Sequence, residues 1–272
     1  MSLLDDLEGL IRELNESTAD LSARRKAATK RRVDELVRQL HTTARSLDPV
    51  AVPSRFFDPS DPRQVGRFVG LALVAQPKVP LGEVGKFYGS GVYALYYDGG
   101  HEPYEPIAET EHPIYAGKAD PANGAATTPQ GQGSRLYNRL NDHRRSIQKA
   151  ANLAVADFKC RYLVVQSGWQ TAAESHLIEM FKPIWNSEVG IAYGVGKHGD
   201  SSSTRANKRS PWDTLHPGRG WAWSDPNTED QVPLDDIIAN IQAHYEVVAP
   251  LTSIDLILKR FFDSLRQDGG DS

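Results

Sequence analysis

Apolar residues recur at spacings of three and four in several parts of the chain, which is the pattern of helices that bury one face. Over residues 2–47 this pattern appears twice and is interrupted at residues 15–20, which predicts two helices. Residues 63–76 predict a short amphipathic helix that ends before a proline. Residues 234–266 return to helical spacing, with Pro250 dividing them. Both ends of the chain are therefore expected to be helical.

The middle of the chain has a different pattern, with short runs rich in β-branched and aromatic residues. Residues 91–97 (GVYALYY), 113–117 (PIYAG) and 158–165 (FKCRYLVV) predict three strands. A Gly- and Pro-rich turn separates the first two, so we expect them to pair antiparallel. Helices are predicted over residues 135–153 and 172–182. This order predicts an α+β fold: a small antiparallel three-stranded sheet flanked by helices, with N- and C-terminal helical extensions.

These elements divide the chain into four regions. We expect an N-terminal helical region at residues 1–47, then a linker with a short helix at 48–87. The sheet and its helices fall in residues 88–223, which include an irregular insert rich in Gly, Ser and basic residues at about 187–220. An acidic helical region follows at residues 224–272.

Composition narrows the class of protein. The chain has 272 residues, with 31 Lys and Arg against 35 Asp and Glu, and 39% of its residues are hydrophobic, a balance typical of a globular protein. The single cysteine, Cys160, excludes a disulfide framework and a Cys-based zinc site. No apolar run approaches the ~20 residues that span a bilayer, and the acidic N-terminus does not resemble a signal peptide. We therefore expect a soluble, cytoplasmic protein.

The net charge of −4 hides a segregation of charge along the sequence. Residues 134–220 hold 13 Lys and Arg against seven Asp and Glu, whereas residues 221–272 hold three against ten. A basic segment of this kind is typical of a protein that binds a phosphate backbone. Basic residues also cluster at residues 24–32, where a solvated helix face and a phosphate-binding surface remain equally open.

Six polar residues follow the predicted elements in an order that suggests one site. They are Tyr93, Tyr115, Arg139, His143, Glu174 and Asn186. The two tyrosines lie on the paired strands, and the arginine and histidine, four positions apart, share one face of a helix. The glutamate lies on the next helix and the asparagine follows that helix. Taken singly, each also has an ordinary structural explanation, such as a capping box at residues 171–174 for the glutamate.

The ordered set resembles the GIY-YIG nuclease superfamily. Residues 91–93 (GVY) resemble its first motif and residues 114–118 (IYAGK) its second, and the arginine, glutamate and asparagine fall where the superfamily places them. The RLNDH context of the arginine and the segment at residues 210–219 resemble a narrower group, the Eco29kI-like type II restriction endonucleases. The superfamily resemblance covers roughly residues 88–186, and the narrower one runs from about residue 55 to residue 223.

Two departures from the superfamily pattern matter for the site. Ala116 stands where the second motif usually has a branched apolar residue, a change that we expect to leave Tyr115 in place. The loop before the predicted helix is longer than in repair nucleases of the superfamily, so both Arg135 and Arg139 are candidates for the family arginine. The spacing to His143 favours Arg139.

The resemblance implies Mg²⁺-dependent hydrolysis of a phosphodiester, with Glu174 as the metal ligand and Mn²⁺ as an alternative ion. Tyr93 is expected to act as general base once nearby cations depress its pKa, with His143 relaying the proton. Arg139 is expected to stabilise charge on the phosphate oxygens, and Tyr115 to bond the phosphate. The asparagine is expected to bond backbone around the site. Which of the two tyrosines and the histidine is the base stays open.

Basic residues around the motifs are expected to contact DNA. They are Lys118, Arg135, Arg144, Lys197, Arg205, Lys208, Arg209 and Arg219. The last five belong to the insert, whose loop at residues 190–209 is expected to enter a groove and read guanine edges. The alternative for that loop is a plain flexible surface segment.

The resemblance implies a site-specific type II restriction endonuclease that cuts double-stranded DNA at a GC-rich palindrome, with CCGCGG as the family precedent. It also implies a homodimer, because a palindrome matches a two-fold protein, and a cognate DNA methyltransferase as genetic partner. Two alternatives remain: a structure-specific repair or mobile-element nuclease with the same chemistry, and a DNA-binding protein with an inactive site.

Overall fold

The computed structural model describes residues 3–18, 21–47, 49–50, 57–186, 208–223 and 225–267. The chain forms two compact units, Met1–Arg55 and Phe56–Ser272. All of the sheet and every element that carries a candidate catalytic residue belong to the second unit.

The first unit consists of two helices, α1 (Leu3–Thr18) and α2 (Ala23–Ser46), as the apolar spacing predicts. The break comes later than expected, because α1 continues to Thr18, whose hydroxyl bonds a carbonyl one turn back at 2.9 Å. The apolar faces of both helices are largely exposed, with Leu10 at 62% and Leu40 at 45%. These two faces are therefore available for packing against another surface.

Four antiparallel strands form the sheet, in the order β1-β4-β2-β3. They are β1 (Val79–Pro80), β2 (Gly91–Tyr97), β3 (Tyr115–Ala119) and β4 (Phe158–Val164). The three strands predicted from the sequence are confirmed, with β3 starting two residues later than expected. The expected count of three strands is wrong by one. β1 has only two residues, one of them a proline, so it carries no alternation that a sequence pattern could show.

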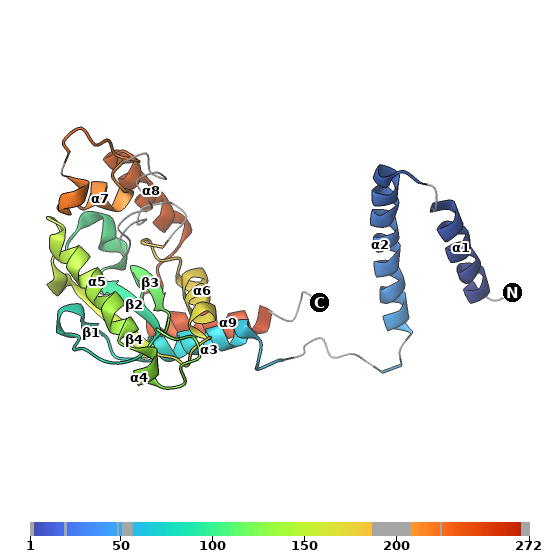
Figure 1. Cartoon of the computed structure of the whole chain (residues 1–272), viewed down its shortest axis with the longest axis horizontal. Coiled ribbons are helices and arrows are strands. Elements are labelled where there is room, and N and C mark those ends of the chain that lie inside the picture. Colours follow the sequence, from blue (N-terminus) through green and yellow to red (C-terminus); the bar gives the residue numbers. More distant parts are fainter. Residues whose placement is uncertain are drawn as a thin grey trace. The chain divides into compact units, whose positions relative to one another are not determined.

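Helices cover both faces of the sheet. They are α3 (Pro62–Val74), α5 (Arg135–Lys149), α6 (Gln170–Phe181) and α9 (Ile254–Gln267). β2 is central and buried along its whole length, and its side chains alternate between two hydrophobic clusters. Tyr93 and Leu95 face the cluster that contains α5, whereas Val92 and Ala94 face the cluster built from α3, α6 and α9. Figure 1 shows α5 on one side of the strands and α3, α6 and α9 on the other.

The C-terminal helices pack onto this core. α8 (Leu234–Val247) buries Ile237 and Ile241 in the cluster shared with α5. On α9, Phe261 is buried and its ring meets that of Phe68 on α3 edge-on at 5.7 Å. Among the described residues, no helix has the length and apolar character needed to cross a membrane.

Short helical elements connect the larger ones. They are η1 (Leu81–Glu83), η2 (Glu102–Ile107), α4 (Pro129–Gln132), η3 (Val155–Asp157), α7 (Pro211–Leu215) and η4 (Gly220–Ala222). The segment expected to be irregular up to residue 220 therefore contains one α-helical turn. α7 forms because Ser210 caps it, accepting the Asp213 N–H at 3.2 Å, and because Pro211 takes its first position.

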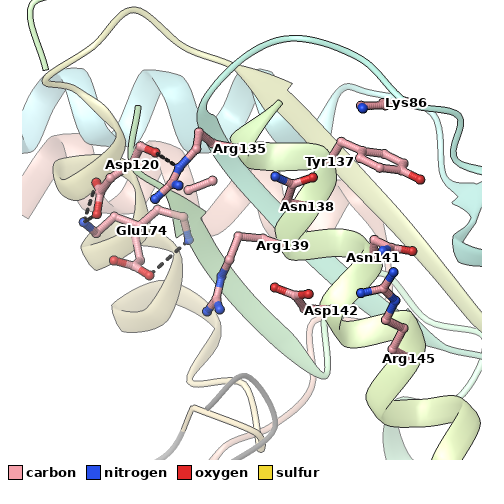
Figure 2. A pocket seen from close by; sticks show the side chains of 12 residues that line it. Lys86, Asp120, Arg135, Tyr137, Asn138, Arg139, Asn141, Asp142, Arg145 and Glu174 are labelled. Carbon is pink, nitrogen blue, oxygen red and sulfur yellow. Dashed lines mark hydrogen bonds and ion pairs between the residues drawn. The ribbon is translucent and has the colours of Figure 1, made fainter. Parts of the chain in front are cut away.

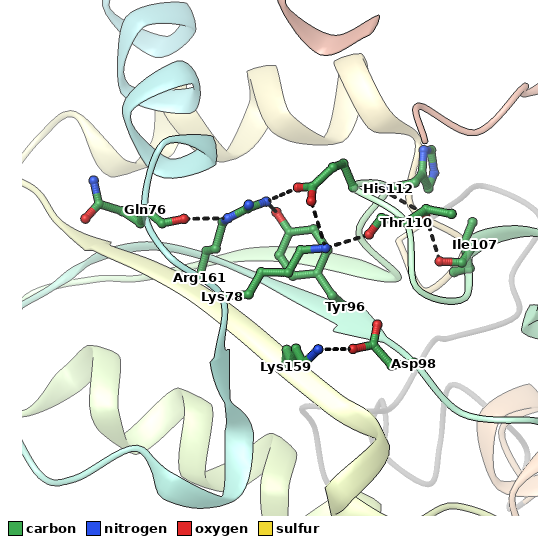
Figure 3. Close-up of polar contacts among 10 residues, drawn as sticks. Gln76, Lys78, Tyr96, Asp98, Ile107, Thr110, His112, Lys159 and Arg161 are labelled. Carbon is green, nitrogen blue, oxygen red and sulfur yellow. Dashed lines mark hydrogen bonds and ion pairs between the residues drawn. The ribbon is translucent and has the colours of Figure 1, made fainter. Parts of the chain in front are cut away.

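A buried polar network ties the β1 edge of the sheet to the loop before β3 (Figure 3). Arg161 on β4 donates to Glu111 at 2.6 Å, to the Tyr96 hydroxyl at 3.1 Å and to the Gln76 carbonyl at 2.6 Å. Lys78 pairs with Glu111 at 3.2 Å. Each of these charges has a partner, as burial requires, so the network is structural. The opposite face of β2 carries the candidate site.

Candidate active site

Three aromatic side chains from β2, β3 and α5 meet at the centre of the candidate site. The Tyr93 hydroxyl and His143 Nε2 are 2.7 Å apart, and the ring centroids of Tyr115 and His143 are 4.8 Å apart. Tyr93 and His143 are fully buried, whereas Tyr115 is partly exposed. The β2–β3 pairing and the helix that packs on it therefore place both motif tyrosines around one imidazole.

Two glycines permit this close packing. A Cβ at Gly117 on β3 would lie 2.8 Å from the Tyr93 hydroxyl and 2.8 Å from the Tyr115 ring. A Cβ at Gly91 on β2 would lie 2.0 Å from the Leu163 carbonyl oxygen on β4. A side chain at either position would push the rings or the strands apart, so each motif glycine has a packing reason.

Asn186 fixes β3 to the chain that leaves α6. Its Oδ1 accepts the Ala116 N–H and its Nδ2 donates to the Ala116 carbonyl, both at 2.8 Å. The Trp185 N–H bonds the Ile114 carbonyl at 2.9 Å. β3 is an edge strand, and these bonds satisfy backbone groups that the sheet leaves unpaired. Asn186 therefore holds in place the strand that carries Tyr115.

Glu174 comes from α6 and is directed at β3. Its Oε1 accepts the Lys118 N–H at 3.1 Å. The capping box considered at residues 171–174 is wrong, because α6 begins at Gln170, its cap position is Trp169, and no side chain caps it. Burial raises the pKa of Glu174, and the charge and backbone N–H of Lys118 oppose that rise. A cation bound beside such a partly desolvated carboxyl group would favour its ionised form.

A cleft of about 780 Å³ opens beside Glu174 and Arg139 (Figure 2). It is lined by Lys86, Lys118, Ala119, Asp120, Arg135, Tyr137, Asn138, Arg139, Asn141, Asp142, Arg145 and Glu174. Five of these are cations and three are carboxylates. Arg139 connects the cleft to the rings, because its guanidinium interacts with the phenols of Tyr93 and Tyr115. Arg135 instead donates to a backbone carbonyl at 3.1 Å, so Arg139 is the arginine that reaches the tyrosines.

Burial sets the protonation states of the Tyr93–His143 pair. It raises the pKa of Tyr93 well above its ordinary value, with Tyr115 adding to the rise and Arg139 opposing it. Burial, together with the charge of Arg139, lowers the pKa of His143 to about 3. The protein's own cations therefore do not depress the pKa of Tyr93, since desolvation of the buried phenol outweighs the arginine. At neutral pH both groups are uncharged and joined by one hydrogen bond.

Two of the eight basic residues expected to contact DNA line the cleft, namely Lys118 and Arg135. The Lys118 ammonium pairs with Asp120 at 2.7 Å, and Arg135 donates to the Asp120 carbonyl. Arg144 is partly buried, does not line the cleft, and donates to Asn141 at 2.5 Å. Lys118 and Arg135 are therefore placed for a ligand in the cleft, and Arg144 positions a neighbouring side chain.

The arginines at the end of the insert have internal partners. Arg219 forms two bonds to Asp213, at 2.6 and 2.8 Å, and both residues are buried. It therefore holds α7 by a bidentate ion pair, and its expected contact with DNA stays a prediction that this geometry does not support. Arg209 pairs with Asp230 at 2.6 Å and lies over the Trp223 ring at 4.3 Å, so it serves packing first.

The rest of the insert is described only in part. Lys208 has a partly exposed side chain and pairs with Glu229 at 2.9 Å, a contact that solvent weakens. Lys197 and Arg205 lie outside the described residues, as does almost all of the 190–209 loop. The role of that loop in reading DNA stays a prediction.

Sequence reasoning missed seven polar residues of the cleft: Lys86, Asp120, Tyr137, Asn138, Asn141, Asp142 and Arg145. Three of them recur every four residues along α5, opposite the apolar face of that helix, so helical periodicity could have identified them. Lys86 and Asp120 gave no such signal, because they come from segments beside the strands that only the folded sheet brings to the helix.

The side chains of the cleft indicate which metal ion could bind there. Among the described residues there is no cluster of three His, Cys, Asp or Glu side chains that could hold a metal ion. The cleft offers a smaller set of oxygens, the carboxylate of Glu174 with that of Asp120 close enough to affect its pKa. Mg²⁺ keeps several waters and is often held by only one or two carboxylates. The donor set therefore suits a hydrated Mg²⁺ or Mn²⁺ ion and not a zinc ion.

The fold and the site together define a class of protein. Paired strands each present a tyrosine, and flanking helices deliver an arginine, a histidine and a glutamate to the same place, which is the arrangement of a GIY-YIG nuclease domain. The family model described as the Eco29kI GIY-YIG domain matches residues 85–245, and the chain belongs to this family. It is therefore a nuclease whose substrate is DNA. A comparison with individually curated proteins gives no match.

Proposed function

We propose that the chain is a Mg²⁺-dependent, site-specific type II restriction endonuclease acting on double-stranded DNA. The observation that carries this proposal is that Glu174 and Arg139 line one cleft, and that Arg139 also interacts with the buried Tyr93, which is bonded to His143. The five cations that line the cleft suit a polyanionic ligand. Membership of the Eco29kI family supports restriction over repair as the biological role.

The groups facing the cleft bind and stabilise the phosphate. The Arg139 guanidinium donates charge-assisted hydrogen bonds to its non-bridging oxygens and stabilises the charge that develops there. Tyr115 is partly exposed and donates its hydroxyl to the same phosphate. When bound at Glu174, Mg²⁺ supplies Lewis-acid activation of the phosphate and a more acidic water.

The buried pair moves the proton of the attacking water. Tyr93 holds its own proton in the resting enzyme, because burial raises its pKa. It accepts a proton from water only as it passes its hydroxyl proton to His143 Nε2, which lies 2.7 Å away. His143 is neutral, because burial lowers its pKa to about 3, so the lone pair of Nε2 is available for that proton. The same burial makes the imidazole a weak base, so the two proton transfers take place together and no stable imidazolium forms. In this proposal Tyr93 is the base and His143 its proton acceptor.

Assembly and target belong to the same proposal. A GC-rich palindrome, with CCGCGG as the family precedent, would be cut by a homodimer with one site per strand. The exposed apolar faces of α1 and α2 support association through these helices, since faces of this kind are normally covered. A cognate DNA methyltransferase would protect the host genome in the same cytoplasm.

The test is cleavage of unmethylated plasmid DNA in the presence of Mg²⁺ or Mn²⁺. Wild-type protein should give discrete bands, and Glu174→Ala should give none. Glu179→Ala is the matched control, because Glu179 lies on the same helix, is exposed and does not line the cleft; it should cut as wild type does. Cleavage of branched DNA alone would instead indicate a repair nuclease. Salt-sensitive binding without cleavage under either metal would indicate an inactive DNA-binding protein.

A further inference from the structure

The cleft continues beyond the groups that the proposed chemistry uses. Glu174 and Asp120 lie on one side of Arg139, and further lining residues lie on the other side (Figure 2). These residues form a distal subsite, consisting of Lys86, Tyr137, Asn138, Asn141 and Arg145. None of them has a role in the proposed hydrolysis, so their presence in the same cleft needs another explanation.

The two cations of the distal subsite differ from the other cations of the cleft. Lys118 is paired with Asp120, and Arg135 bonds a carbonyl. Within the part of the chain that the structure describes, the side chains of Lys86 and Arg145 take part in no ion pair or hydrogen bond. A cation that lines a cleft without an internal hydrogen-bond partner has its donors available for an anionic ligand.

The distal subsite is built on packed elements. Phe87, which follows Lys86, stacks on Tyr162 with centroids 4.7 Å apart and meets Tyr137 edge-on at 6.2 Å. The carbonyl of Gly89 accepts an N–H from the first turn of α5 at 3.0 Å. The loop that carries Lys86 is therefore tied to the helix that carries the arginine, which limits the entropy lost when a ligand binds.

The spacing along α5 matches the spacing of phosphates along a DNA strand. Arg145 follows Arg139 by six residues, which is about 9 Å along the helix axis. One strand of B-DNA advances about 3.4 Å per nucleotide along the duplex axis. If α5 runs along the duplex axis with the scissile phosphate at Arg139, Arg145 lies level with a phosphate two or three nucleotides away.

We propose that the distal subsite binds the phosphodiester two or three nucleotides from the cleaved bond, on the cleaved strand, through Arg145 and Lys86. The amide groups of Asn138 and Asn141 supply neutral donors beside them. Asp142 lies in the same wall and offsets part of their charge, so the subsite holds one phosphate and not a run of them. This inference rests on the proposed nuclease function.

A binding experiment tests the subsite independently of catalysis. Fluorescence anisotropy with a 30-base-pair duplex, in a Glu174→Ala background, gives the dependence of log K on log salt. Arg145→Ala should lower affinity about tenfold and reduce the slope by about one, as the loss of one phosphate contact predicts. Lys149→Ala is the matched control, since it removes one charge from α5 one turn further on and outside the cleft. Equal losses in the two variants would overturn the proposal.

A second experiment locates the contact on the DNA. Once the cut position is mapped, single uncharged methylphosphonates are placed at each of three positions on either side of it on the cleaved strand. One position, two or three nucleotides away, should cost wild type about tenfold in kcat/KM and cost Arg145→Ala nothing further. Fully additive losses at every position would overturn the subsite. If wild type cuts no DNA, the proposed function fails, and the binding experiment still decides the subsite.

Discussion

Replacing Gly117 by alanine tests the packing of the candidate site with a single methyl group. The backbone φ of Gly117 is not in the positive region, so an L-residue can adopt it without backbone strain. The added Cβ would meet the Tyr93 hydroxyl at 2.8 Å, its Cζ at 2.9 Å and the Tyr115 ring at 2.8 Å. All three are atoms of rigid rings, and Tyr93 is fully buried, so neither ring can rotate away without disturbing its neighbours.

The size of the effect follows from these contacts. Inserting a methyl into a packed core costs about 1–3 kcal/mol. For a unit of this size that cost lowers Tm by roughly 2–12 °C. The cleavage rate should fall by more than the loss of folded protein explains. The reason is that the added methyl contacts the Tyr93 hydroxyl, which bonds His143 at 2.7 Å. Moving that hydroxyl by a few tenths of an ångström weakens both this hydrogen bond and its position relative to Arg139. We expect kcat to fall about 100-fold, as for other misplaced catalytic groups.

The assay measures plasmid cleavage at saturating DNA and thermal unfolding of the same preparations. Gly100→Ala is the control, since a Cβ there meets nothing within 4 Å, and it should match wild type in both measurements. The reasoning is refuted if Gly117→Ala also cuts at the wild-type rate with an unchanged Tm. A large loss of Tm with kcat intact in the folded fraction would show that the methyl strains the sheet and not the site.

Three further predictions concern single charges. Glu174→Gln should keep the bond from Lys118 and lose at least about 100-fold in cleavage rate. Burial raises the pKa of Glu174, so ionising this carboxyl group lowers the stability of the fold above the pKa of an ordinary Glu. Calorimetry at pH 7 should therefore find Glu174→Gln no less stable than wild type. At pH 3, where the carboxyl group is protonated in both the folded and the unfolded chain, this contribution should be absent. Arg219→Ala leaves the buried Asp213 charge unpaired and should cost about 3–5 kcal/mol in urea unfolding; a loss of DNA affinity at unchanged stability would contradict this assignment. Burial lowers the pKa of His112 to about 4, so the stability from its neutral form is full above pH 6.5 and is lost as pH falls toward 4. Tm measured from pH 7 to pH 5 should therefore fall less in His112→Gln than in wild type, and equal slopes would exclude this contribution.

The neutral Tyr93–His143 pair has a consequence for the pH dependence of cleavage. His143 has a pKa of about 3, so its protonation cannot produce a loss of activity between pH 5 and pH 8. An acidic limb in the rate profile within that range must come from another group. Glu174 is the candidate, because its pKa is raised and its neutral form is a poor ligand for a cation.

Local patterns in the sequence determined most of the secondary structure and the identity of the site. Runs of β-branched and aromatic residues predicted β2 and β4, and apolar spacing predicted the longer helices, because each pattern extends over several residues. The short helices α4 and α7 were not predicted. The ordered motif residues pointed to the correct family. β1 escaped this reasoning because two residues cannot show a period. It exists only because β4 offers Cys160 and Lys159 as antiparallel partners for Val79 and Pro80.

The sequence also predicted which residue types the chemistry needs, but it did not predict how deeply they are buried or which groups they bond. It suggested that a tyrosine near an arginine would have a depressed pKa, and it suggested a capping role for Glu174. Desolvation decides the first matter, because Tyr93 lies on the buried central strand. Strand pairing decides the second, because β3 presents the Lys118 N–H to Glu174 across the sheet edge. Burial and partner geometry depend on elements far apart in the chain.

The charged residues show most clearly what the sequence predicts and what only the tertiary structure decides. Counting them along the sequence revealed that basic charge gathers between residues 134 and 220. The count could not separate Arg145, which faces the cleft, from Arg219, which is buried against Asp213. Composition and periodicity are properties of the chain and can be read from it directly. Whether a charge meets solvent, a ligand or an opposite charge is decided only when tertiary packing chooses its neighbours.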